Sequence, residues 1–200
     1  MSKQFWNERY SQHETVYGDQ PNRFFKSFID SNEPGSILLP AEGEGRNALY
    51  AASKGWDVHA FDQSEIGREK TLHKAKEKGI EIKYDILNVD DFHSSVQYDA
   101  IGLIYVHLEP ALRKKFHKEL VKSLKPGGKL VLEAFNPNQR DHNSGGPKDV
   151  SMLYDTEMLR DDFSALIIDQ NEALEVVLNE GPFHQGSAEV VRFRGHKNRS

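Results

Sequence analysis

Cysteine is absent from the 200 residues of this sequence. Its absence excludes a disulfide framework and any thiolate chemistry carried by the protein itself. Long hydrophobic runs are absent as well. No apolar stretch approaches the ~20 residues that a membrane-spanning helix needs, and the first residues lack the apolar core of a signal peptide. We therefore expect a soluble, cytoplasmic protein with no membrane partner.

An excess of positive charge is also absent. The 26 Lys and Arg residues are outnumbered by 31 Asp and Glu residues, which gives a net charge of −5. A basic stripe that would bind a nucleic acid is lacking, so we expect no nucleic-acid partner. Nine histidines are present, but no pair has the spacing and acidic partner of a zinc-binding helix, and we predict no metal site. The 37% hydrophobic content suits one globular domain, which we expect to be a monomer or weak homodimer.

The chain is organised around a glycine turn at residues 37–47. A short apolar run ends at Pro40, Gly43 and Gly45 follow, and a helix-forming stretch begins near Ala48. Open α/β sheets make nucleotide sites from such a strand, turn and helix. Glycine lets backbone approach a ligand where a Cβ would clash, and the helix start offers unpaired N–H groups. An ordinary tight turn without a ligand is the simpler alternative.

Strand-like and helix-like segments alternate through residue 135. We expect strands at 36–39, 57–61, 80–84, 98–104 and 129–135, with helices at 46–54, 64–78 and 110–123 and a turn at 125–128. Short connections between alternating elements predict a parallel, doubly wound sheet with right-handed crossovers. After residue 135 we expect a long loop at 136–150 and a short helix at 155–163. Two strands at 165–179 and 187–195 should then form an antiparallel pair at the sheet edge.

Two acidic residues follow the expected strands on the side of the glycine turn. Asp62 ends the second strand, where one carboxylate can accept from two ribose hydroxyls; a helix N-cap is its alternative role. Asp85 ends the third strand, where it can accept from an adenine amino group while Ile86 and Leu87 pack on the ring; a plain loop carboxylate is the alternative. Residues 43–48 also fit a dinucleotide fingerprint, so an NAD-dependent oxidoreductase stays open, although no Tyr-x-x-x-Lys set accompanies it.

The segment Leu-Lys-Pro-Gly-Gly at residues 124–128 joins an expected helix end to a strand. Together with the glycine turn, Asp62 and Asp85, it resembles the class I S-adenosylmethionine-dependent methyltransferases. Residues 5–10, 17–18, 21–22, 42–47, 62–64 and 144–147 are similar to the small bacterial methyltransferases of the tellurite-resistance and thiopurine-methyltransferase type. The resemblance implies a Rossmann-like, mostly parallel sheet with an antiparallel C-terminal edge hairpin.

The same resemblance implies a function and a division of the chain. We expect S-adenosylmethionine as cofactor and methyl transfer to a small molecule, a thiol or another soft nucleophile. Residues 1–30 would form a helical lid, 36–135 the cofactor-binding core, and 136–200 the acceptor-side loops and edge strands of a single domain. A non-catalytic binding protein on this fold is the third possibility, beside the oxidoreductase.

The implied cofactor contacts come from the lid and from the ends of the strands. They are Trp6, Tyr17, Glu42, Gly43, Glu44, Gly45, Arg46, Asp62, Gln63, Asp85, Ile86, Leu87 and Tyr105. Trp6 and Tyr17 would shelter the sulfonium by cation–π contact, or Trp6 simply packs its helix on the domain. Arg46 equally suits a local pairing role. The chain departs from the family pattern at Leu39, usually acidic, and Ala41, usually glycine, and we expect Glu42 to take over part of the missing carboxylate's role.

On the acceptor side, His107 follows the central strand and is the candidate general base. A hydrogen-bonded loop histidine is its alternative role. Glu133, Phe135, His142 and His184 are weaker candidates for the acceptor pocket. Because a sulfonium already carries a good leaving group, alignment and exclusion of water should supply most of the rate, and no single catalytic residue should dominate.

Overall fold

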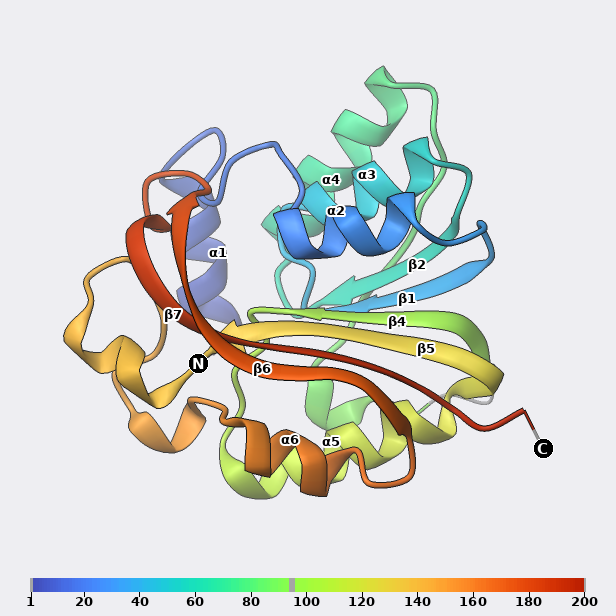
Figure 1. Ribbon diagram of the computed structural model, residues 1–200. Helices are drawn as coiled ribbons and strands as arrows, with labels where there is room; N and C mark the ends of the chain where they lie inside the picture. The colour runs from blue at the N-terminus through green and yellow to red at the C-terminus, as the bar shows by residue number, and fades with distance from the viewer. Residues whose placement is uncertain (1, 94–95, 200) are drawn as a thin grey trace.

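The computed structural model describes residues 2–93 and 96–199. Seven strands and six α-helices are present in this part of the chain (Figure 1). In chain order the elements are α1 (Lys3–Ser11), α2 (Arg23–Asp30), β1 (Ser36–Pro40), α3 (Arg46–Ser53), β2 (Asp57–Asp62), α4 (Glu65–Glu77), β3 (Lys83–Ile86), β4 (Tyr98–Ile104), α5 (Pro110–Lys122), β5 (Leu124–Phe135), α6 (Thr156–Asp162), β6 (Ile167–Asn179) and β7 (Gln185–His196). Short 3₁₀ turns occupy Val89–Asp91, Pro137–Asp141 and Val150–Met152.

The strands form one sheet in the order β3-β2-β1-β4-β5-β7-β6. Strands β1 to β5 are parallel, whereas β7 is antiparallel to both β5 and β6. This confirms the predicted doubly wound, mostly parallel sheet with an antiparallel C-terminal hairpin. The order reverses between β1 and β4, and open α/β sheets bind ligands in the crevice beyond the carboxyl ends of strands at such a point.

The helices cover both faces of the sheet. Helices α2, α3 and α4 pack on one face, α5 and α6 pack on the other, and each face has its own hydrophobic core (Figure 1). Helix α1 lies apart from both layers, at the edge where the parallel strands end, beside the tip of the β6–β7 hairpin. The N-terminal segment and the hairpin tip therefore meet over the carboxyl ends of the strands. Among the described residues, no helix has the length and apolar character needed to cross a membrane.

Local sequence signals explain where several helices begin. The Asn22 side chain accepts from the backbone N–H groups of Phe24 and Phe25, so Asn22 caps α2. Ser64 accepts from the N–H of Gly67 and caps α4, as its position in the sequence predicts. The cap on α4 matters for the site because it frees the neighbouring Asp62 for another role.

Two strands begin more than two residues away from the start expected from the sequence. Strand β3 begins at Lys83 rather than residue 80, because pairing with β2 starts only where Lys83 meets His59. The Lys-Pro-Gly-Gly segment lies inside β5 instead of preceding it. Leu124 already pairs with Tyr98, and a register shift follows before the regular pairing resumes. Gly127, with a φ of 78°, supplies the bend that this irregular strand needs.

Candidate active site

The glycine turn after β1 is built from backbone conformations that side chains rarely adopt. Gly43 and Gly45 have φ values of 59° and 76°, and Ala41, at the position where the family pattern has glycine, has a φ of 51°. A non-glycine residue in this left-handed region carries a conformational cost of roughly 1–2 kcal/mol. The turn is fixed to the next strand because the N–H of Glu42 donates to the carbonyl of Phe61 at 3.2 Å.

Asp62, at the end of β2, holds this turn in place. Its Oδ2 accepts from the N–H of Gly43 at 3.1 Å, and its Oδ1 accepts from the N–H of Ser64 at 2.8 Å. The side chain is buried, and burial raises the pKa of Asp62 to about 6. Each carboxylate oxygen can accept a second hydrogen bond. The geometry therefore suits an acceptor for hydroxyl groups brought to the turn by a ligand.

Glu42 caps the helix that follows the turn. Its Oε1 accepts from the N–H groups of Asn47 and Ala48 at 2.9 and 2.8 Å. Burial raises the pKa of this carboxyl to about 7. No described residue donates a hydrogen bond to Oε2, and the side chain keeps part of its surface open to solvent. One carboxylate oxygen of the turn is therefore left without a protein donor among the described residues.

Protein atoms fill the space beside both glycines. A Cβ on Gly43 would lie 2.3 Å from the hydroxyl of Tyr10, and one on Gly45 would lie 2.2 Å from the Cγ2 of Thr71. The hydroxyl of Tyr84 also donates to the carbonyl of Gly43 at 2.7 Å. Thus helix α4 requires glycine at position 45, whereas α1 places Tyr10 directly over Gly43.

Two charged residues of the turn are engaged by other parts of the protein. Glu44 is buried, and its carboxylate contacts the ammonium of Lys70 and the N–H of Val16. Arg46 donates to the carbonyl of Tyr17 at 3.1 Å and forms an ion pair with Glu180 at 2.7 Å. Both side chains tie the N-terminal segment to the turn, which is the local pairing role considered for Arg46.

The residues expected around an adenine lie at the ends of β2 and β3. Leu87 donates its N–H to the backbone carbonyl of Asp62 at 3.0 Å, which places it and the adjoining Ile86 next to Asp62, the predicted ribose acceptor. Ile86 is 39% exposed. Asp85 instead pairs with His59 at 2.8 Å on the solvent side of the strand. Gln63 directly follows Asp62 in the chain.

Aromatic rings cluster where β4 and β5 end. Tyr105 stacks on Phe135 with ring centroids 4.6 Å apart and meets the edge of His184 at 4.7 Å. Tyr17 lies 4.7 Å from the other side of His184. The φ of Tyr105 is 56°, a strained value for a bulky residue, and strain of this kind is concentrated at functional sites. The predicted acceptor residues Phe135 and His184 therefore lie together, beside the predicted cofactor residues Tyr17 and Tyr105.

A buried network of charges supports this aromatic cluster. Glu133 is 1% exposed and contacts Arg192 at 2.6 Å, the Asn22 amide at 2.6 Å and the Tyr105 hydroxyl at 2.8 Å. The Asn22 amide also reaches Glu180 at 3.1 Å, in the tip of the hairpin. Sequence reasoning missed Asn22, Glu180 and Arg192. No local pattern marked these three residues, because their partners lie far away in the chain.

His107 is held by the backbone on both sides of its ring. Its Nδ1 lies 2.7 Å from the carbonyl of Met152, and its Nε2 accepts from the N–H of Phe135 at 3.2 Å. The imidazole is therefore the neutral tautomer with the proton on Nδ1. Burial lowers the pKa of His107 to about 4. With both nitrogens occupied, the geometry favours the loop-histidine role over that of a general base.

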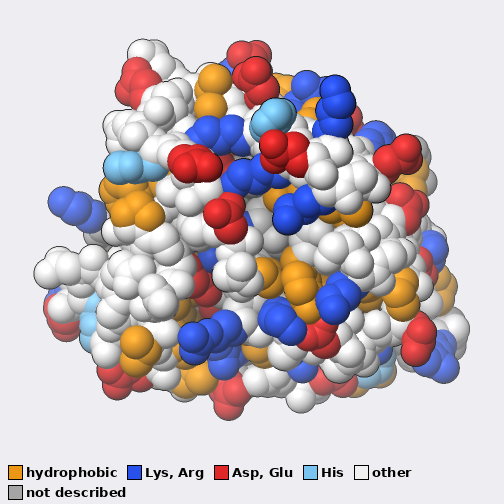
Figure 2. Space-filling view, turned by 90° about the horizontal axis from the view of Figure 1, so that it is seen from above, with side chains coloured by type: hydrophobic (Ala, Val, Ile, Leu, Met, Phe, Trp, Pro, Cys, Tyr) orange, Lys and Arg blue, Asp and Glu red, His pale blue; other side chains and the backbone are white. Residues whose placement is uncertain are grey.

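The remaining predicted residues lie at the margins of the site. Trp6 stacks on Tyr10 with centroids 5.5 Å apart, so its ring extends the cover that α1 forms over the turn. His142 follows the 3₁₀ turn at Pro137–Asp141, and its N–H donates to Gln139 within that loop. Figure 2 views the molecule from above, relative to Figure 1, and shows acidic and basic side chains interspersed over that upper face.

A family model described as "Thiopurine S-methyltransferase (TPMT)" matches residues 1–195. The chain belongs to this family. It is similar to "Probable thiol methyltransferase 2" of Arabidopsis thaliana, with 28% identity over 144 residues covering 69% of this chain and 62% of that protein. It is also similar to "Ubiquinone biosynthesis O-methyltransferase" of Rickettsia akari, with 28% identity over 109 residues covering 54% of this chain and 43% of that protein. The chain thus spans less than two thirds of the length of these relatives.

Solved methyltransferase structures share the fold. TehB from Haemophilus influenzae superposes with a TM-score of 0.76 at 15% identity, covering 89% of this chain and 63% of that one. The N-methyltransferase NodS from Bradyrhizobium japonicum, crystallised with S-adenosylhomocysteine, superposes with a TM-score of 0.75 at 14% identity, covering 98% and 97%. At these identities the likeness shows the fold. The expected fold class and family are therefore confirmed.

Proposed function

We propose that this chain binds S-adenosylmethionine over the glycine turn and transfers its methyl group to a small-molecule acceptor, a thiol or another soft nucleophile. The observation that carries the proposal is the pair of carboxylates at the turn, Asp62 and Glu42, in a member of the thiopurine S-methyltransferase family. Neither the turn nor the aromatic cluster presents a hydride-transfer set, so the oxidoreductase alternative has no support among the described residues.

The residues present fit this cofactor. Asp62 keeps acceptor capacity for the ribose hydroxyls, and the open Oε2 of Glu42 suits the ammonium group at the methionine end. Ile86 and Leu87, with Gln63, would receive the adenine beside the end of β3. When bound, the cofactor supplies an electrophilic methyl group on a sulfonium. The protein's own work is to bind it, align it and exclude water.

The acceptor would lie against the aromatic cluster of Tyr105, Phe135 and His184. Burial lowers the pKa of His184, which favours the neutral ring, and its buried Nδ1 lies 3.8 Å from Oε2 of Glu180, just beyond hydrogen-bond distance. The charged side chains beside this cluster are paired, because Arg46 forms an ion pair with Glu180 and Arg192 forms one with Glu133. Such a pocket suits an uncharged or polarisable acceptor, with His184 as a hydrogen-bonding partner.

The same proposal includes where the protein acts and how it assembles. The acidic charge balance and the single-domain composition support a cytoplasmic monomer or weak homodimer that acts on small molecules, with no nucleic-acid or membrane partner. Sedimentation velocity at micromolar concentration tests the assembly state. A stable higher oligomer would contradict it.

The experiment that tests the activity is a methyl-transfer assay with labelled S-adenosylmethionine. A panel of small thiols is compared with the matching alcohols and amines, and product and S-adenosylhomocysteine are both quantified. We expect at least one thiol to be methylated faster than its oxygen and nitrogen analogues. Cofactor binding without transfer to any acceptor would favour the non-catalytic alternative. A larger rise in the thermal stability of the protein with NAD than with S-adenosylmethionine would contradict the proposal.

A further inference from the structure

Helix α1 covers the glycine turn, yet little apolar contact holds it there. The helix has nine residues, and only Tyr10 among them is buried. An isolated helix of this length is unstable in water, so its presence depends on the contacts that dock it. Apart from the buried Tyr10 ring and Arg9, whose guanidinium lies 4.2 Å from the centroid of the Phe183 ring in the hairpin tip, those contacts are polar. The Ser64 hydroxyl donates to the Asn7 side chain at 2.6 Å, and Lys3 pairs with Glu65 on the surface.

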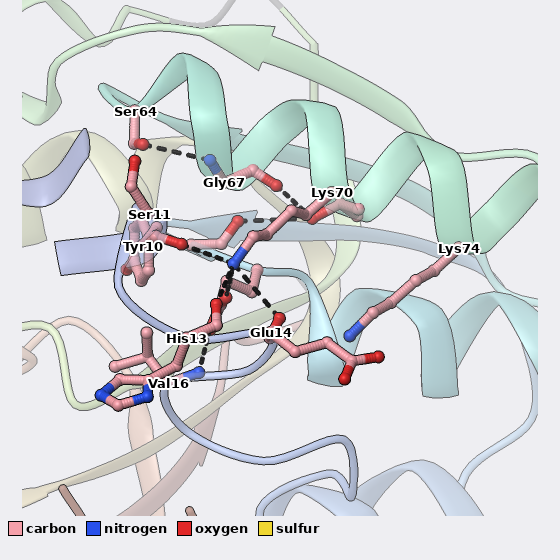
Figure 3. Close-up of polar contacts among 12 residues, drawn as sticks. Tyr10, Ser11, His13, Glu14, Val16, Ser64, Gly67, Lys70 and Lys74 are labelled. Carbon is pink, nitrogen blue, oxygen red and sulfur yellow. Dashed lines mark hydrogen bonds and ion pairs between the residues drawn. The ribbon is translucent and has the colours of Figure 1, made fainter. Parts of the chain in front are cut away.

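Lys70 is the centre of this docking (Figure 3). It projects from α4, and its ammonium lies within hydrogen-bond distance of the backbone carbonyls of Tyr10, His13 and Glu14. These carbonyls belong to the end of α1 and the turn that follows, where backbone acceptors lack helical partners and a positive charge is favoured. The Lys70 side chain therefore binds carbonyls at the end of α1 and ties that helix to α4.

Glu44 links the same ammonium to the glycine turn. Its Oε1 accepts from Lys70 at 2.8 Å, and its Oε2 accepts from the N–H of Val16 at 2.7 Å. Glu44 is the residue between the two glycines, so the cofactor turn and the covering segment share one buried carboxylate. The Lys70 side chain keeps 24% of its surface exposed, which leaves the pair within reach of water.

The docked position of α1 closes the route to the turn. Asp62 is 6% exposed and Tyr10 is 5% exposed, with the Tyr10 hydroxyl against Gly43. A ligand can reach the Asp62 carboxylate from solvent only if α1 moves away. A cover held by a few polar contacts can move without unfolding the core, and covers of this kind control how ligands enter and leave a site.

We propose that Lys70 is a positioning residue that, through Glu44, latches α1 over the bound cofactor and so sets how long the cofactor is retained. This inference rests on the proposed cofactor site. The latch places Tyr10 and Trp6 over the turn, and it leaves the carboxylates that contact the cofactor unchanged. Its loss should speed the release of cofactor without altering the sheet.

The test compares Lys70→Met with wild type in two measurements. Hydrogen exchange of the ligand-free protein should be roughly tenfold faster in residues 3–17, and unchanged in the strands, because charged hydrogen bonds to several carbonyls are lost. S-adenosylhomocysteine should dissociate roughly tenfold faster. Lys74→Met is the matched control, since Lys74 lies one turn along α4 and pairs at 2.6 Å with the exposed Asp19; it should stay within about twofold of wild type in both measurements.

Two further variants test the latch independently of Lys70→Met. Glu44→Gln preserves an acceptor for Val16 but removes the charge partner of Lys70, and it should reproduce the faster exchange even if Lys70→Met folds poorly. Lys70→Arg restores a cation with several donors and should recover much of the retention. Any one of three results would overturn the latch. They are unchanged hydrogen exchange in residues 3–17, an unchanged rate of S-adenosylhomocysteine dissociation, and a Lys70→Arg variant that behaves like Lys70→Met. If wild type fails to bind S-adenosylhomocysteine, the proposed function fails, while the exchange measurement still reports whether Lys70 docks α1.

Discussion

Asp62 and Gly43 are joined by a hydrogen bond of 3.1 Å that links the end of β2 to the glycine turn after β1. The same carboxylate is the expected partner of the cofactor ribose. Asp62→Ala should therefore weaken S-adenosylhomocysteine binding by about 1.5–3 kcal/mol, or roughly 10- to 150-fold, because charged hydrogen bonds are lost. Asp57→Ala, at the exposed start of the same strand, is the control. Calorimetry that finds equal affinities for the two variants would remove Asp62 from the site.

Glu42→Gln should stabilise the ligand-free protein above neutral pH. Burial raises the pKa of Glu42 to about 7, so the folded chain holds a proton that the unfolded chain releases near pH 4.5. This contribution to stability is present at low pH and is lost as the pH rises to about 7. Glutamine keeps the oxygen that caps α3 and has no charge to bury. We expect a gain of about 1–3 kcal/mol at pH 8 and little change at pH 4.5, measured by chemical denaturation.

The same carboxylate should make cofactor affinity depend on pH. Only ionised Glu42 attracts the ammonium group, so wild type should bind S-adenosylhomocysteine roughly twentyfold more tightly at pH 8 than at pH 6, about tenfold of it from Glu42 and about twofold from Asp62. In Glu42→Gln this dependence should shrink to about twofold, the part expected from Asp62 with its pKa of about 6. Calorimetry at the two pH values measures both effects. Equal pH dependence in the two proteins would show that Glu42 does not face the cofactor's charge.

Ala41→Gly should stabilise the turn that opens the site. Ala41 has a φ of 51°, which costs an alanine about 1 kcal/mol and costs glycine little. Part of the gain is offset by the greater freedom of glycine in the unfolded chain. We expect a higher midpoint of thermal unfolding with cofactor affinity retained. Ala52→Gly, the same change within α3, should lower the midpoint; a lower midpoint for both variants would contradict the strain at position 41.

His107→Gln should affect stability more than catalysis. Both ring nitrogens bind backbone groups, so the substitution should cost about 1–3 kcal/mol of unfolding free energy. The pH dependence of kcat should keep its shape, because His107 has no free nitrogen to remove a proton. Denaturation and a pH–rate profile with one acceptor provide the measurements. If the wild-type rate falls on the acid side as the pH drops through the pKa of His107, and this acidic limb is lost in His107→Gln, the general-base role would be restored.

Local patterns in the sequence were sufficient for the fold. The apolar strands, the caps such as Ser64, and the Leu-Lys-Pro-Gly-Gly segment all act through near neighbours, so their meaning survives without the structure. Asp62 was found for the same reason, since the end of a strand after a glycine turn has one place in this fold. The structure adds that the Asp62 carboxylate also holds the glycine turn in place, through the hydrogen bond it accepts from the N–H of Gly43.

The residues that close the site were not predictable in this way. Asn22 contacts Glu133 across 111 positions and Glu180 across 158, and Lys70 reaches the carbonyl of Tyr10 across 60. In the sequence these side chains look like ordinary surface polar residues, because nothing local marks them as buried or paired. His107 shows the same limit: its position was predicted, but the carbonyl of Met152 that occupies its ring comes from a distant loop.

Calorimetric titration of wild type with S-adenosylhomocysteine, alongside NAD, tests the central claim most directly. The paired carboxylates at the glycine turn should bind one S-adenosylhomocysteine per chain with micromolar or tighter affinity, show no binding of NAD, and lose most of that affinity in Asp62→Ala. Binding of NAD in place of S-adenosylhomocysteine, or an absence of heat with either ligand, would contradict the account.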